Sequence, residues 1–369
     1  MLGGTSLKAM EVLAALEDVF GTPLETAALR GGADTLAGLV DHLLAQADSR
    51  ADAGDRGGPD GTPGTARSGG PVPQDSGTLA VVALACRFPG SDTPEAYWRL
   101  LAEGRDLVTP VPPHRWDGDR VPAARWGAFL KDPDAFDAER FGMSEEEART
   151  LDPQARLLLE LAHEALERAG YAGPRRRAHR IGVFTTAGDS GYRELLDRAA
   201  GDSGTDLPPS ALTGNLPNLL AARIARHFDL DGPALAVDTA CSSALAALHL
   251  ARRSLTAGEC DIALVGGVNL HLTPTAHRML HAAQALSPTG RSRAFAADAD
   301  GFVPGEGGAV LVLRREEDAR RSGDDLLAVV RGTAVNNDGA SLSLMAPNPA
   351  RQREVITAAH SAAGVDRPR

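Results

Sequence analysis

The chain has 369 residues, of which 43% are hydrophobic and only 4% aromatic, and its formal net charge at pH 7 is −11. Aliphatic side chains must therefore fill the core, and the acidic balance argues against nucleic acid or an anionic membrane as a partner. The sequence holds no run of 18 apolar residues and no signal-peptide pattern, so we expect a soluble, cytoplasmic protein. Its three cysteines, Cys86, Cys241 and Cys260, have no metal or redox spacing, so we predict no metal site.

Residues 1–46 predict a small all-α segment. Apolar residues recur at helical spacing from Ser6 to Phe20, Gly21 ends that helix, and residues 35–44 predict a second short amphipathic helix. Ser6 stands at the start of the first helix, where serine commonly serves only as an N-cap.

Residues 47–77 predict a disordered linker. Eight glycines and four prolines are mixed with polar residues there, and Val72 is the only large apolar side chain. Such a segment cannot bury enough apolar surface to offset the entropy lost on ordering.

From residue 78 onward, apolar strands alternate with helices, which predicts an α/β layered fold with largely buried sheets. The predicted strands are Leu79–Ala85, Arg180–Thr186, Ala234–Val237, Asp261–Val265, Ala309–Leu313 and Leu326–Val330. The predicted helices are Thr93–Glu103, Ser144–Ala169, Thr213–Phe228, Cys241–Ala257, Pro274–Ala285 and Glu316–Ser322.

The stretch 235–258 carries the candidate chemistry, because Cys241 lies where a short apolar strand passes into an almost wholly apolar helix. That pattern predicts a helix buried in a large core. The free N–H groups and positive dipole end at the helix start would stabilise a thiolate, or an oxyanion on a bound thioester. The alternative is a buried structural thiol, since cysteine is among the most often buried residues.

Residues 238–250 resemble the nucleophile motif of the ketosynthase (β-ketoacyl synthase) domains of modular type I polyketide synthases. They read Asp-Thr-Ala-Cys-Ser-Ser followed by Ala-Leu-Ala-Ala-Leu-His-Leu. The resemblance covers nearly all of Leu79–Val365 and includes Leu-Asp-Pro-Gln-Ala-Arg-Leu-Leu-Leu-Glu at 151–160 and Gly-Phe-Val-Pro-Gly-Glu-Gly at 301–307. It implies a thiolase-like layered fold for residues 78–369, with the first half ending at about 325 and only the start of a second half at 326–369.

The N-terminal segment resembles the C-terminal part of an acyl carrier protein, on Gly3-Gly4-Thr5-Ser6-Leu7. In that family the serine receives 4′-phosphopantetheine, which maps to Ser6. Thr5 stands where the family usually has aspartate, and this departure puts the modification in question.

The ketosynthase resemblance implies that Cys241 accepts an acyl chain and that the complete synthase condenses it with a malonyl-type unit on a carrier protein, releasing carbon dioxide. It also implies a homodimer that works with other synthase domains. In the family, two histidines in glycine-flanked motifs assist the condensation, and none of the ten histidines here has that context. We assign a structural or surface role to each of them, including His163, His249, His271, His277, His281 and His360. We therefore expect this chain alone to be inactive in condensation.

Three alternatives to the condensing enzyme stay open at this point. The chain could belong to an acyl-transfer-only domain, which loads but does not condense, or to a non-catalytic carrier–ketosynthase scaffold that only docks partners. A cysteine peptidase also uses a cysteine at a helix start. The long flanking match speaks against the peptidase.

Overall fold

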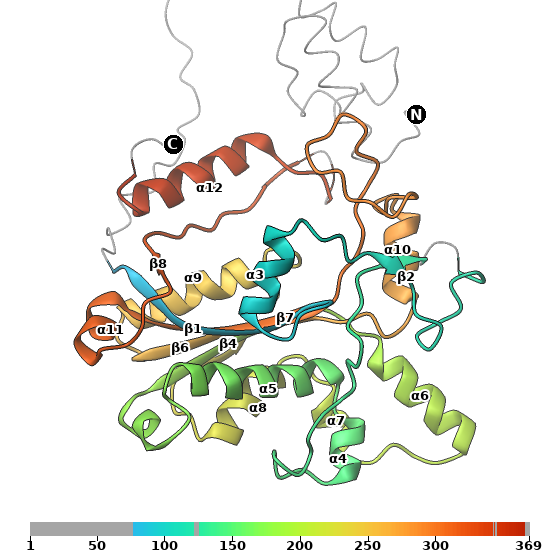
Figure 1. Ribbon diagram of the computed structural model, residues 1–369, viewed down its shortest axis with the longest axis horizontal. Coiled ribbons are helices and arrows are strands. Elements are labelled where there is room, and N and C mark those ends of the chain that lie inside the picture. The colour runs from blue at the N-terminus through green and yellow to red at the C-terminus, as the bar shows by residue number, and fades with distance from the viewer. Residues whose placement is uncertain (1–76, 122–124, 342, 344, 366–369) are drawn as a thin grey trace, which may run out of the picture. The chain divides into compact units, whose positions relative to one another are not determined.

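The computed structural model describes residues 77–121, 125–341, 343 and 345–365 (Figure 1). The described residues fall into two units, one within Ser76–Arg331 and the other from Gly332 onward. We call the first the sheet unit. The predicted carrier segment at 1–46 with Ser6, and the predicted linker except for its last residue, lie outside the described residues.

A mixed six-stranded sheet, in the order β5-β4-β6-β7-β1-β8, organises the sheet unit. Its strands are β1 (Leu79–Arg87), β4 (Ile181–Ala187), β5 (Ala234–Ala236), β6 (Ile262–Asn269), β7 (Gly307–Arg315) and β8 (Ala328–Val330). Strand β4 pairs in parallel with β5 and β6, while β7 is antiparallel to both β6 and β1, and β8 is antiparallel to β1. The carboxyl ends of β4, β5 and β6 therefore meet at one edge of the sheet.

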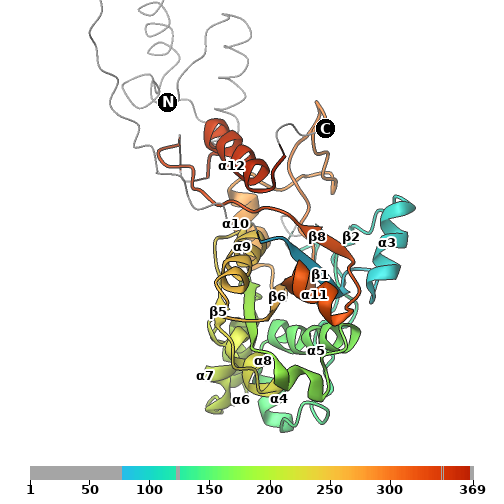
Figure 2. The same ribbon diagram turned by 90° about the vertical axis from the view of Figure 1, so that its left-hand side faces the viewer.

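Helices cover both faces of this sheet (Figure 1). Helices α5 (Pro153–Arg168) and α8 (Leu219–Phe228) pack on one face and build the larger cluster of buried side chains. Helix α9 (Ser243–Thr256) packs on the opposite face and builds a second cluster with Phe184, Val265 and Leu313. The four central strands are largely buried, whereas all three residues of β5 are exposed. Strand β5 lies at one edge of the sheet (Figure 2).

All six predicted strands are present, but two helix predictions were wrong in part. The expected helix Ser144–Ala169 is two helices, α4 (Glu145–Thr150) and α5, because Leu151 and Asp152 turn to extended backbone before Pro153. Asp152 then caps α5 by accepting a hydrogen bond from Gln154 N at 2.8 Å. The expected helix Thr213–Phe228 is likewise a short α7 (Ser210–Gly214) followed by α8.

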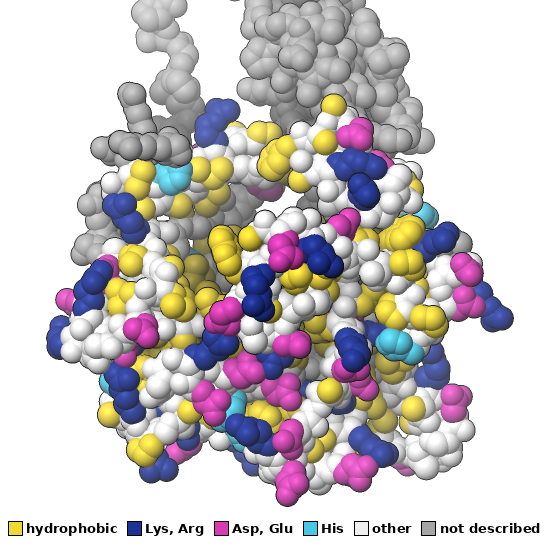
Figure 3. Space-filling model, viewed as in Figure 1, with side chains coloured by type: hydrophobic (Ala, Val, Ile, Leu, Met, Phe, Trp, Pro, Cys, Tyr) yellow, Lys and Arg dark blue, Asp and Glu magenta, His cyan; other side chains and the backbone are white. Residues whose placement is uncertain are grey.

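The remaining elements are short or peripheral. They are α3 (Pro94–Ala102), β2 (Thr109–Pro110), β3 (Trp126–Gly127), a 3-10 turn (Pro174–Ala178), α6 (Tyr192–Ser203), α10 (Thr275–Ala282), α11 (Glu316–Ser322) and α12 (Pro349–Ala362). Helix α12 belongs to the second compact unit. Basic and acidic side chains are interspersed over the face of the sheet unit that Figure 3 shows. Ion pairs of this unit include Arg168–Glu95 and Arg87–Glu164.

Helix α9 is not buried on every side, contrary to the expectation from its composition. Its small residues Ala246, Ala247 and Ala251 pack on the sheet, but 72% of Leu245 and 38% of Leu250 are exposed.

Candidate active site

Cys241 lies in the turn between β5 and α9 and its side chain is exposed. The helix begins two residues later, at Ser243, so the cysteine stands just before the helix rather than inside it. The alternative of a buried structural thiol is therefore wrong for Cys241, although Cys86 and Cys260 are buried thiols of that kind.

The turn is held in a left-handed conformation at the residue before the cysteine. Ala240 has φ of +56°, a region that costs an L-residue with a Cβ about 1–2 kcal/mol. Hydrogen bonds keep it there: Ala240 N donates to Asp238 Oδ1 at 3.0 Å, and Ser243 Oγ donates to the Ala240 carbonyl at 2.6 Å. A sharp turn of this kind between strand and helix presents a side chain outward, as nucleophile elbows do in other enzymes.

The start of α9 has no side-chain cap. Ser242 is the N-cap residue, but its hydroxyl donates to the Thr239 carbonyl at 2.9 Å instead of accepting from the first turn of the helix. The positive end of the helix dipole is thus left unblocked beside the cysteine. A negative charge that forms close to Cys241 would be stabilised there.

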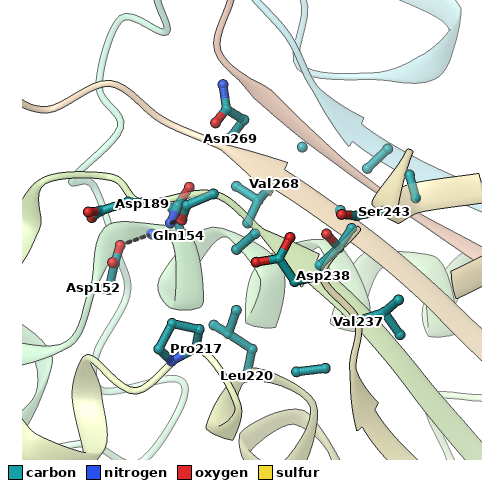
Figure 4. Close-up of a pocket in the computed structure, with 18 of the residues that line it drawn as sticks. Asp152, Gln154, Asp189, Pro217, Leu220, Val237, Asp238, Ser243, Val268 and Asn269 are labelled. Carbon is teal, nitrogen blue, oxygen red and sulfur yellow. Dashed lines mark hydrogen bonds between the residues drawn. The ribbon is translucent and has the colours of Figure 1, made fainter. Parts of the chain in front are cut away.

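Cys241 lines a cavity of about 1030 Å³ at the carboxyl ends of the parallel strands. The wall includes Gly188 after β4, Val237 and Asp238 after β5, and Val268 and Asn269 at the end of β6. Figure 4 shows Pro217 and Leu220 along one side of it, with Ser243 of α9 opposite Asp152 and Gln154. Most of the lining is small or aliphatic, which suits an extended aliphatic chain.

The cavity also carries charged groups, namely Asp152, Asp189, Asp238 and Arg193. Asp152 is the most enclosed of them, and burial raises the pKa of its carboxyl above its usual value, against the opposing effect of its hydrogen bonds from Gln154 N and Ser190 Oγ. Those bonds place Asp152 in a structural role at the start of α5.

A buried ion pair fixes the wall next to β7. Arg115 donates to both oxygens of Glu306, at 3.1 and 2.9 Å, and only 5% and 0% of the two side chains are exposed. Glu306 accepts two further bonds from backbone N–H groups, from Leu130 at 2.8 Å and from His271 at 2.9 Å. The Glu306 carboxylate therefore joins the segments that hold Arg115, Leu130 and His271. Glu306 directly precedes Gly307 and Gly308, which line the cavity.

No histidine is among the described residues that line the cavity. His271 and His277 are buried beside Trp116, and burial lowers the pKa of both rings, that of His271 to about 4. His249 lies within α9, and burial lowers its pKa also. None of these three rings lines the cavity, and the structural or surface role assigned to them stays a prediction.

Metal-binding clusters and membrane-spanning helices are both absent from the described residues. No group of three or more His, Cys, Asp or Glu side chains there is arranged to hold a metal ion. No helix in that part of the chain is long and apolar enough to cross a membrane.

Sequence reasoning missed Asn269 as a polar residue of the cavity wall, and it missed the contacts by which His271 and Glu306 support it. A signal was present, because Asn269 comes shortly after the predicted buried strand Asp261–Val265, at the same sheet edge as Cys241. The contacts of Asn269 with Gly305 and of His271 with Glu306 join positions more than 30 residues apart, which no local pattern reveals.

An exposed cysteine in a strand–turn–helix, beside a cavity at the ends of parallel strands, is the arrangement typical of an α/β enzyme with a cysteine nucleophile. Family models agree with this class. The β-ketoacyl synthase N-terminal domain matches residues 77–319, the β-ketoacyl synthase C-terminal domain matches residues 327–369, and a phosphopantetheine attachment site matches residues 1–43. The chain belongs to the β-ketoacyl synthase family, as a ketosynthase of the polyketide synthase type.

Curated relatives are polyketide synthases. The chain is 48% identical over 298 residues to a component of the phenolphthiocerol/phthiocerol polyketide synthase of Mycobacterium tuberculosis, a match that covers 78% of this chain and 16% of the relative. It is 45% identical over 299 residues to the phthioceranic/hydroxyphthioceranic acid synthase of Mycobacterium bovis, covering 78% and 14%. The chain therefore spans about one sixth of the length of these relatives.

Solved ketosynthases share the fold. The Streptomyces albus oxazolomycin ketosynthase domain matches with a TM-score of 0.72 and 37% identity, over 78% of this chain and 51% of that one. The ketosynthase from module 6 of the bacillaene synthase of Bacillus subtilis 168 matches with a TM-score of 0.71 and 34% identity, over 78% and 49%. These matches confirm the predicted thiolase-like α/β fold class.

Proposed function

We propose that Cys241 is the acyl-accepting nucleophile of a ketosynthase within a larger polyketide synthase. The observation that carries this proposal is the position of Cys241, exposed in the turn before α9 and in the wall of the cavity. The thiolate attacks the carbonyl carbon of an acyl thioester, and a new bond forms between the Cys241 sulfur and that carbon. The tetrahedral intermediate collapses, the carbon–sulfur bond of the donor breaks, and the donor thiolate leaves and takes a proton from solvent. The uncapped start of α9 favours the negative charge of the attacking sulfur.

Intact-mass spectrometry tests this step. The chain is incubated with a butanoyl thioester of N-acetylcysteamine, and we expect one butanoyl adduct, which Cys241→Ala loses. The matched controls are Cys86→Ala and Cys260→Ala, which remove buried thiols and should keep the adduct. An adduct that persists in Cys241→Ala contradicts the assignment, and no adduct in the unaltered chain favours the non-catalytic scaffold.

We also propose that the condensation itself needs groups which this chain does not bring to Cys241. No described histidine lines the cavity, and none of the ten histidines stands in the family's glycine-flanked motifs. The chain alone should therefore load an acyl group without extending it. Formation of a β-ketoacyl product from a malonyl thioester by the purified chain would refute this.

The N-terminal segment is proposed to be a carrier with 4′-phosphopantetheine on Ser6. The match of residues 1–43 to a phosphopantetheine attachment site supports it. Treatment with coenzyme A and a phosphopantetheinyl transferase should add one arm to the chain and none to Ser6→Ala. Modification at another serine would show that Ser6 is not the attachment site. The absence of any modification would contradict the carrier proposal and would agree with Thr5 standing in place of the family's usual aspartate.

Acyl and malonyl-type thioesters on carrier proteins, together with the other synthase domains, are the partners that we propose. A cytoplasmic location accords with three cysteines that are all free. We further propose a homodimer, for which the uncovered edge strand β5 with its exposed Leu235 offers support. Sedimentation equilibrium should show a dimer that Leu235→Lys weakens.

A further inference from the structure

The side chain of Asn269 has a fixed orientation in the cavity wall. Its Nδ2 donates to the Gly305 carbonyl at 3.1 Å and contacts His271 Nε2 at 3.1 Å. Because a carbonyl oxygen only accepts, the amide nitrogen and not the oxygen must face Gly305. Both amide hydrogens are thereby used, one on Gly305 and one on His271.

His271 is held in the state that this arrangement requires. Burial, with smaller effects of His277 and Arg115, lowers the pKa of His271 to about 4, so the ring is neutral at pH 7 and Nε2 can accept. Its backbone is fixed on both sides, since His271 N donates to Glu306 Oε1 at 2.9 Å and Arg115 donates to the His271 carbonyl at 3.1 Å. The ion pair of Arg115 and Glu306 therefore sets the position of His271, and His271 sets that of the Asn269 amide.

The opposite end of the amide is left open. The Asn269 side chain is half-buried, and among the described residues no group donates to its Oδ1. That oxygen lies over the backbone of Gly188, where an added Cβ would come within 2.8 Å of it. Both residues line the cavity, and Figure 4 shows the Asn269 nitrogen turned away from the other labelled side chains. The missing side chain at residue 188 thus leaves room for a ligand beside Oδ1.

We propose, resting on the acyl transfer proposed above, that Asn269 Oδ1 accepts a hydrogen bond from an N–H or O–H group of the thioester substrate. The donor is either the amide of the thiol-bearing arm or a hydroxyl of the acyl chain. Asn269 is then a substrate-positioning residue. Gly188 provides the space for it, and His271 with Glu306 provides its orientation. An oxygen that is oriented but unpaired favours a substrate with a donor over the same substrate without one.

Two matched pairs of thioesters separate the sources of the donor. The first pair is butanoyl-N-acetylcysteamine and its N-methyl analogue, which lacks the amide N–H. The second pair is 3-hydroxybutanoyl- and butanoyl-N-acetylcysteamine. For each pair, the rate of adduct formation on Cys241 gives a preference ratio, and differences in intrinsic reactivity cancel when the ratios of variants are compared. For one of the two pairs, we expect the preference ratio for the donor-bearing thioester to be about 3- to 10-fold larger in the unaltered chain than in Asn269→Ala. This factor corresponds to the free energy of a single hydrogen bond.

Gly188→Ala is the second variant and guards against misfolding of Asn269→Ala. The backbone of Gly188 does not require a left-handed conformation, and the new methyl group would come within 2.8 Å of Oδ1, so the Asn269 amide must shift while Asn269, His271 and Glu306 keep their residue types. It should lose the same preference. Arg177→Ala, an exposed change at the far end of the sheet unit, should keep it. Equal ratios in the unaltered chain, Asn269→Ala and Gly188→Ala would overturn the proposal.

The hydrogen bond to Asn269 can still be tested if the acyl transfer itself does not occur. Cys241→Ala, which cannot react, is then titrated with N-acetylcysteamine thioesters by ligand-observed NMR. The acceptor role is supported if the donor-bearing member of one pair has a lower Kd than its partner and this difference is absent in Cys241→Ala/Asn269→Ala. Equal Kd values for both members of each pair reject it, whatever the chemistry of Cys241.

Discussion

Acidification should destabilise the sheet unit through His271, and the size of the effect follows from its burial. Only 8% of His271 is exposed, and burial is the main reason that its pKa falls from 6.5 to about 4. Because the pKa is lowered in the folded state, the unfolded chain takes up the proton first as the pH drops. The stabilising contribution is therefore complete above pH 6.5 and is lost progressively between pH 6.5 and 4. Linkage with these two values gives a loss of about 2 kcal/mol at pH 5 and about 3 kcal/mol below pH 4.

Urea unfolding at pH 7.5 and pH 5.0, followed by tryptophan fluorescence, measures this loss. Trp116 is a suitable reporter because its ring lies 5.3 Å from that of His277, in the same cluster as His271. Because His271 is not the only ionisable group in the chain, the comparison is with His271→Leu. The difference in unfolding free energy between the two pH values should be smaller in the variant by about 2 kcal/mol. Equal differences in the two proteins would show that His271 is not held neutral by burial.

Three further predictions concern stability at neutral pH. Ala240→Val should lower the free energy of unfolding by more than about 2 kcal/mol, because a β-branched residue disfavours the left-handed backbone at this position. Ala240→Gly should change that free energy by less than about 1 kcal/mol. Similar unfolding free energies for the two variants would refute the strained turn. Glu306→Ala should lower the free energy of unfolding by about 3–5 kcal/mol, because it leaves Arg115 buried and unpaired. Glu95→Ala, in an exposed ion pair, should cost much less in the same urea unfolding experiment. Leu158→Ala removes a fully buried side chain of α5 and should lower the free energy of unfolding by about 2–5 kcal/mol. Urea unfolding should show a lower midpoint with an unchanged slope. A loss below about 1 kcal/mol would mean that neighbouring side chains fill the cavity left by the substitution.

The helix boundaries show where local pattern was insufficient. The apolar periodicity of residues 144–169 runs through Leu151 and Asp152, yet the chain turns there because Pro153 disfavours helical backbone at the residue before it. That proline was visible in the sequence and could have placed the break. Pro217 likewise stands inside the expected helix Thr213–Phe228 and could have placed the break between α7 and α8. The sequence did not show how that break is anchored, by the buried amide of Asn215, which donates to the carbonyls of Thr150 and Ala211. A contact across 65 residues leaves no mark on the local sequence.

The sequence by itself determined the strands, their alternation with helices and the place of Cys241 between a strand and a helix. These features follow from apolar spacing and from small residues around the turn, which act over a few neighbouring positions. The tertiary structure alone decided that Cys241 opens onto a cavity, that His271 is neutral, and that Asn269 presents its oxygen to the same space. Those properties depend on burial and on hydrogen bonds between strands and loops that are distant in the chain. They exist only after the sheet has brought its carboxyl ends together.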